Sequence, residues 1–127
     1  MMNLDTCDLI EQAKALATEL EVGFCMSILN EKGQKEFFIR IGEIRPCSIE
    51  LAEKKAVTAY EFSHDNHEIY RLLKSLGDMP LVSKAYCFIP GGKVVSSTSG
   101  IKYFLGISSS DPHKDLDIVN QLANYLD

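Results

Sequence analysis

Two basic residues, Arg40 and Lys55, are the first candidates for binding a charged ligand, because one ends a predicted strand and the other lies on the helix predicted to follow it. Either cation can hold a ligand carboxylate through charge-assisted hydrogen bonds. The competing interpretation is a surface charge or a structural ion pair, for instance Arg40 with Glu43 or Glu50. The sequence leaves both interpretations open for Arg40 and favours the structural one for Lys55.

Two loops could bind a ligand through backbone N–H groups and hydroxyls instead of through charged side chains. Gly91 and Gly92 follow a proline, and glycine lets a backbone approach a ligand closely with bare N–H groups, although a tight turn between strands explains the same residues. Ser108 begins a run of three serines that precedes Asp111. Hydroxyls and free N–H groups before a helix can hold a carboxylate or phosphate, but ordinary helix capping is the favoured interpretation.

Histidine and cysteine are the remaining candidates. His64 and His67 have a spacing that could chelate a metal or ligate haem iron, and exposed histidines in a turn between helices are the favoured alternative. His113 is expected to be exposed. Cys47 precedes a predicted helix whose dipole could lower its thiol pKa, although a buried, unreactive cysteine is common. The four cysteines form no closely spaced pair, so the sequence predicts free thiols and no metal site.

Length, net charge and the absence of a long apolar run indicate which class of protein the chain belongs to. The chain has 127 residues, which predicts one domain over residues 1–127. A net charge of −5 argues against nucleic acid and anionic membranes as partners, although Arg40, Arg45, Lys54 and Lys55 could form a local basic patch. The chain contains no apolar run of the roughly 18 residues that a membrane span needs. The acidic start does not resemble a signal peptide, so we expect a cytoplasmic protein.

Hydrophobic periodicity predicts the secondary structure. A helix ends near Leu20, and a strand over 22–29 has one strongly buried face. A hairpin turn at 30–33 leads into a second strand over 35–41. The next helix opens at 46–49 with Ser48 near its cap, carries a small-residue face of Ala52, Ala56 and Ala59, and ends near residue 62.

The second half of the chain predicts a helix over 67–76, strands over 84–88, 93–95 and 102–108, and a last helix capped by Asp111. Strands and helices in this order favour an α/β (α+β) fold, with a single antiparallel sheet and helices packed on its faces.

Two segments of the chain resemble the signature blocks of the GlcG/HbpS-like family, which comprises haem-binding or "haem-degrading" domains and the C-terminal domain of PduO-type corrinoid adenosyltransferases. The first block runs over residues 40–59 and the second over residues 90–115. The matching residues of the first block are Arg40, Ser48, Ala52, Lys55, Ala56, Thr58 and Ala59. Those of the second are Pro90, Gly91, Gly92, Gly100, Gly106, Ser108 and Asp115.

The resemblance implies a profilin-like domain that assembles as dimers or higher oligomers. It implies a cytosolic module that binds haem, another tetrapyrrole or a small carboxylate. The expected pocket lies between the sheet and the second helix, lined by Arg40, Lys55, Gly91, Gly92 and Ser108. Two other functions stay open: an enzyme or accessory subunit of small hydroxy-acid or diol metabolism, and a structural interaction protein without a small ligand.

Overall fold

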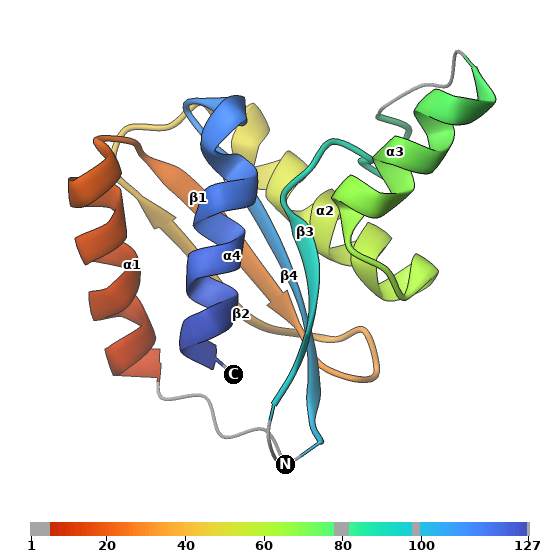
Figure 1. Ribbon diagram of the computed structural model, residues 1–127. Helices are drawn as coiled ribbons and strands as arrows, with labels where there is room; N and C mark the ends of the chain where they lie inside the picture. The colour runs from red at the N-terminus through yellow and green to blue at the C-terminus, as the bar shows by residue number, and fades with distance from the viewer. Residues whose placement is uncertain (1–5, 78–81, 98–99, 127) are drawn as a thin grey trace.

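A four-stranded antiparallel sheet with the strand order β2-β1-β4-β3 forms the centre of the fold (Figure 1). The strands are β1 (Phe24–Leu29), β2 (Lys35–Ile41), β3 (Gly92–Ser96) and β4 (Lys102–Ser109). This is a computed structural model, and it describes residues 6–77, 82–97 and 100–126. The predicted hairpin between the first two strands is confirmed, with Gly33 at a φ of 76°.

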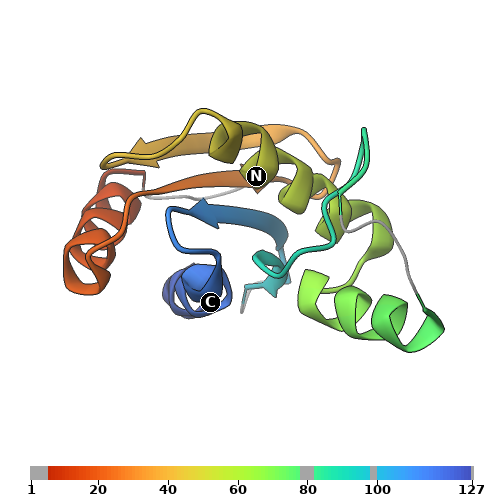
Figure 2. The ribbon, with the colours of Figure 1, turned by 90° about the horizontal axis from the view of Figure 1, so that it is seen from above.

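Helices cover both faces of the sheet. α1 (Thr6–Leu20) and α4 (Asp115–Leu126) lie side by side on one face, and α2 (Cys47–Phe62) lies on the other (Figures 1 and 2). α3 (Asn66–Leu76) packs beside α2 and β3. The predicted α/β fold with helices on the faces of one antiparallel sheet is therefore confirmed. Within the described residues, no helix is both long and apolar enough to span a membrane.

Strand β1 is buried along its whole length. Phe24, Met26 and Ile28 belong to the apolar core under α1 and α4. The residues between them, such as Cys25 and Ser27, are also fully buried. The alternation in the sequence predicted one buried face, and the second face is buried as well because α2 covers it.

The contact between α2 and β4 depends on small residues. Ala52, Ala56 and Ala59 are fully buried, which confirms the predicted small-residue face. Opposite them, a Cβ atom added to Gly106 would lie 2.0 Å from the carbonyl oxygen of Ala52 and 2.5 Å from the backbone nitrogen of Ala56. Glycine at this position therefore lets the helix backbone rest almost directly on the strand.

The predicted strand over 84–88 is wrong. Only an isolated bridge between Val82 and Cys87 forms in this region. The backbone N–H of Tyr86 donates to the hydroxyl of Ser83 at 2.9 Å, and that of Cys87 donates to the hydroxyl of Thr58 at 2.9 Å. Side-chain oxygens thus take the hydrogen bonds that a neighbouring strand would have supplied.

Two predicted helix starts also need correction. Ser48 does not cap α2, since Pro46 takes the capping position and Ser48 is buried inside the first turn. Asp111 caps a short 3₁₀ turn, Pro112–Lys114, by accepting from the backbone N–H of His113 at 3.1 Å. The proline after Asp111 tightens the chain into this turn first, and α4 begins only at Asp115.

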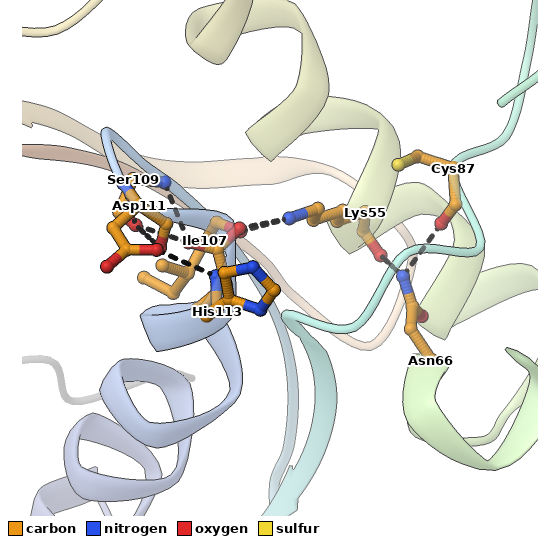
Figure 3. Close-up of polar contacts among 8 residues, drawn as sticks. Lys55, Asn66, Cys87, Ile107, Ser109, Asp111 and His113 are labelled. Atoms are coloured by element: carbon orange, nitrogen blue, oxygen red, sulfur yellow. Dashed lines mark hydrogen bonds and ion pairs between the residues drawn. The ribbon is translucent and has the colours of Figure 1, made fainter. Parts of the chain in front are cut away.

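A buried ion pair joins both layers of helices through the end of β4. The Nζ atom of Lys55 lies 2.7 Å from the carboxylate of Asp115. It also donates to the carbonyl oxygen of Ile107 at 2.9 Å (Figure 3). Asp115 also accepts from the backbone N–H and the hydroxyl of Ser109. Both charged side chains are 2% exposed, so Lys55 forms the structural ion pair that the sequence favoured.

Substitution of Gly106 by Ala is expected to destabilise the protein by about 1–3 kcal/mol or more, because the new methyl group meets helix backbone that cannot rotate away. Urea unfolding followed by circular dichroism measures this loss. Ser96→Ala, at an exposed position of the neighbouring strand, is the control and should change stability by less than about 0.5 kcal/mol. Equal stability of Gly106→Ala and wild type would mean that the close approach of α2 is not required.

Removal of one partner of the buried pair is expected to cost far more than removal of an exposed one. Asp115→Asn leaves the Lys55 ammonium buried without its counter-charge, at an expected cost of about 3–5 kcal/mol. Glu50→Gln breaks the pair between the exposed Glu50 and the partly buried Lys54, and should cost less than about 1 kcal/mol.

The same unfolding measurement on Asp115→Asn, Lys55→Met and the double variant gives a double-mutant cycle, which measures the coupling between the two charges. The double variant should be less destabilised than the sum of the two single variants. Additive effects within about 0.5 kcal/mol would show that the two charges do not depend on each other.

Candidate functional site

A pocket of about 780 Å³ lies where the N-terminus of α2 meets the ends of β2 and β4. Its walls come from the end of β2, the loop over residues 42–46, the first turns of α2, residues 108–110 and Pro112. The volume falls within the usual range for sites that bind small molecules and cofactors. Its lining combines two arginines, a glutamate (Glu43), a cysteine and four serines with apolar side chains such as Ile44 and Leu51.

Strand register brings Arg40 and Ser108 to this pocket. Cys25 on the central strand pairs with Arg40 on one side and with Ser108 on the other, so these three residues form one row across the sheet. The Arg40 side chain is exposed and makes no hydrogen bond or ion pair with any residue in the described ranges. Its predicted partner Glu50 pairs with Lys54 instead, at 3.0 Å. Arg40 is thus free to meet a ligand.

Arg45 and Cys47 complete the polar part of the pocket. Both are exposed, and Cys47 is the first residue of α2. The sequence indicated Arg45 only as one member of a basic patch. Its distance of five residues from Arg40, across a loop where Gly42 adopts a φ of 74°, was the available signal that both arginines face one site.

The three serines at 108–110 line the pocket, and two of them also make hydrogen bonds that hold the fold together. Ser109 is buried, and its hydroxyl contacts the carboxylate of Asp115 and the carbonyl oxygen of Asp111. Ser110 is exposed, and its backbone N–H donates to the carbonyl oxygen of Gly23 at 3.0 Å. The structural role that the sequence favoured therefore explains Ser109 and Ser110. All three serines nevertheless belong to the pocket lining.

Lys55, Gly91 and Gly92 are not among the residues that line this pocket. The carbonyl oxygen of Gly91 accepts from the backbone N–H of Ile107 at 2.9 Å, and Gly91 has a φ of 131°. A Cβ atom on Gly92 would lie 2.4 Å from the side chain of Asn66. The two glycines are thus explained by close packing, and ligand contact by these three residues stays a prediction.

Asn66 shows why this second region is closely packed. It is fully buried, and its side-chain amide donates to the carbonyl oxygens of Cys87 at 2.8 Å and Lys55 at 3.4 Å (Figure 3). The amide thereby joins α3 to α2 and to the segment before the glycines. This region is a polar junction between elements of the fold.

The histidines lie outside the pocket lining. His64 and His113 are exposed, as predicted. His67 is partly buried in the first turn of α3, where its ring and the carboxylates of Asp65 and Glu68 have donor atoms within 4.8 Å of one another. Asp65 already binds Lys93 at 3.0 Å and the backbone N–H of Val94 at 2.8 Å, so its two oxygens serve the contact between α3 and β3.

The thiols differ in their surroundings. Burial raises the pKa of Cys25, and the positive charge of Arg40 partly offsets this effect. Burial also raises the pKa of Cys87. Cys7 and Cys47 are exposed, and all four cysteines are free, as the sequence predicted. Of these thiols, Cys47 is the one among the residues that line the pocket.

Solved structures with the same fold include a PduOC–haem complex and HbpS. The structure described as a PduOC–haem complex is 23% identical, with a TM-score of 0.82, and the match covers 98% of this chain and 93% of that one. HbpS is 20% identical, with a TM-score of 0.77, and the match covers 100% and 92% of the two chains.

A third structure, protein ORFY of Klebsiella pneumoniae, is 17% identical, with a TM-score of 0.79 and coverage of 98% and 95%. At these identities the structural matches establish the fold alone. Comparison with curated proteins finds no significant match. The sequence model of the haem-degrading, HbpS-like proteins matches residues 3–124. Because this match spans nearly the whole chain, the protein belongs to the HbpS-like family.

Proposed function

We propose that this domain is a binding module for an anionic small molecule, with haem as the first candidate. The observation that carries the proposal is the pocket in which Arg40, Arg45 and Cys47 come together beside apolar walls. Two guanidinium groups without an ion-pair partner among the described residues suit two carboxylates, and a guanidinium binds a carboxylate in a bidentate manner.

The donor set of the pocket fits haem. A cysteine thiolate is an established axial ligand of haem iron, and Cys47 is exposed at the pocket. Arg40 and Arg45 would hold the propionates, and Ile44, Leu51 and the neighbouring prolines would contact the ring. A structure described as a haem complex has the same fold, which supports this choice of ligand.

Binding, and not catalysis, is the role we propose. The two thiols with raised pKa values, Cys25 and Cys87, lie outside the pocket lining. A neutral buried thiol is a poor nucleophile, so neither suits an activated catalytic group. Four free thiols are consistent with the reducing environment of the cytoplasm, where we propose that the module acts. We also propose that it self-associates, as the resemblance implies.

Titration of the purified protein with haemin is expected to give a saturable Soret band with one haem per chain. Cys47→Ser should change the position of this band, because it removes the thiolate donor. Cys7→Ser, which alters the other exposed cysteine, should leave the band unchanged. A titration without saturation would exclude haem, and an unchanged band in Cys47→Ser would place the iron ligand elsewhere.

Arg40→Ala is expected to weaken haemin binding about 10- to 100-fold, the range for loss of a charged hydrogen bond. The dissociation constant from the same absorbance titration measures the effect. Arg71→Ala is the matched control, because Arg71 is an exposed arginine on α3 outside the pocket. Equal dissociation constants for Arg40→Ala and wild type would remove Arg40 from the site.

A further inference from the structure

Ser108 is a buried residue whose hydroxyl stays available at the pocket. Its exposed fraction is 4%, and its hydroxyl makes no hydrogen bond with any residue in the described ranges. The hydroxyl of Ser27 is also without a partner there but is fully enclosed, whereas Ser108 lines the pocket. A buried hydroxyl without a partner is costly, so a ligand group that completes this hydrogen bond is favoured.

The pleat of β4 turns this side chain toward the layer of α2. Gly106 faces α2, since a Cβ atom on it would meet the backbone of Ala52 and Ala56. The pairing of β4 with β1 is regular as far as Ser109, and alternate residues of a strand share a face. Ser108 therefore faces the same helix, whose first turn borders the pocket with it.

The buried ion pair fixes both neighbours of Ser108. On one side, the ammonium of Lys55 donates to the carbonyl oxygen of Ile107 at 2.9 Å (Figure 3). On the other side, the backbone N–H of Ser109 donates to the carboxylate of Asp115 at 2.9 Å, and the Ser109 hydroxyl contacts the same carboxylate. The backbone on each side of Ser108 thus depends on one member of the same pair.

Stability alone does not explain why an ion pair occupies this place. Burial of two charges costs desolvation energy, and apolar residues of similar volume often hold a fold equally well. Apolar residues cannot supply the donor that meets the carbonyl oxygen of Ile107 or the acceptor that meets the N–H of Ser109. The pair therefore provides two fixed points for the backbone that carries Ser108.

We propose that the pair of Lys55 and Asp115 positions Ser108, and that the Ser108 hydroxyl donates a hydrogen bond to a carboxylate oxygen of the ligand. Lys55 and Asp115 are positioning residues, because they act through the backbone on either side of Ser108 and do not line the pocket. The inference rests on the proposed function, since it adds a contact and a support to the same site. A carboxylate oxygen fits because it accepts hydrogen bonds and a hydroxyl donates one.

Haemin titrations test the contact and its dependence on the pair. Ser108→Ala should weaken binding about 10-fold, as expected for loss of a hydrogen bond to a charged group. The pair replacement Lys55→Met/Asp115→Leu should bind haemin more weakly than wild type. In that background Ser108→Ala should add less than about a 2-fold loss, because the hydroxyl is no longer held in place. Arg40→Ala should keep its full effect there, since β2 carries Arg40.

Val119→Ala is the control for lost stability, because Val119 is fully buried on α4 and lies outside the pocket lining. It should destabilise the fold and leave the dissociation constant of haemin unchanged. An equal loss from Ser108→Ala in both backgrounds, or equal affinity of wild type and the pair replacement, overturns the positioning role. An unchanged affinity of Ser108→Ala in the wild-type background overturns the contact.

Amide hydrogen exchange of the ligand-free protein tests the positioning without haemin. In the pair replacement, the amide of Ser109 should exchange at least about 10-fold faster, because its acceptor is gone. The amide of Ile107 donates to the carbonyl oxygen of Gly91 and should exchange as in wild type. Unchanged exchange at Ser109 overturns the positioning role whether or not haemin binds.

A milder variant covers the case in which the pair replacement does not fold, which circular dichroism detects. Ser109→Ala keeps the ion pair and removes the hydroxyl contact with Asp115. It should speed exchange at residue 109 and weaken haemin binding, both by a smaller factor, and the absence of both effects overturns the positioning role. A wild type that does not bind haemin instead overturns the proposed function and the Ser108 contact with it.

Discussion

The direct packing of α2 on β4 determines the geometry of this protein. Because Gly106 has no side chain, the backbone of the helix at Ala52 and Ala56 lies against the strand. Side chains at these positions could not be larger without moving the helix away. This short distance fixes how far Lys55 reaches across the end of β4, where its ammonium meets Asp115 on the opposite helix layer. One close contact therefore allows a buried ion pair that ties both layers together.

The pocket follows from the same contact. With α2 held close to the sheet, the first turn of the helix brings Cys47 near the end of β4, where Ser108 lies. The strand register adds Arg40 on the far side of Cys25. Cations, hydroxyls and a thiol thus meet at one end of the sheet. The polar groups around Lys55, Asn66 and the two glycines instead hydrogen-bond or pack against one another, which suits a structural junction better than a ligand site.

The sequence by itself determined the features that depend on local periodicity. The alternation from Phe24 to Ile28 predicted a buried strand, and the spacing of Ala52, Ala56 and Ala59 predicted a close helix contact; both are confirmed. The matching blocks also predicted the HbpS-like family, which is confirmed.

Tertiary structure decided which polar residues face a ligand. Lys55 and Arg40 are both basic candidates in the sequence, yet Lys55 meets a carboxylate 60 residues away, whereas Arg40 has no ion-pair partner among the described residues. The segment over 84–88 likewise lost its predicted strand because the hydroxyl of Thr58, distant in sequence, takes one of its N–H groups. Contacts between residues far apart in the chain leave no local pattern in the sequence. Burial against such a distant partner decides whether a charged side chain forms a structural ion pair or stays available to a ligand.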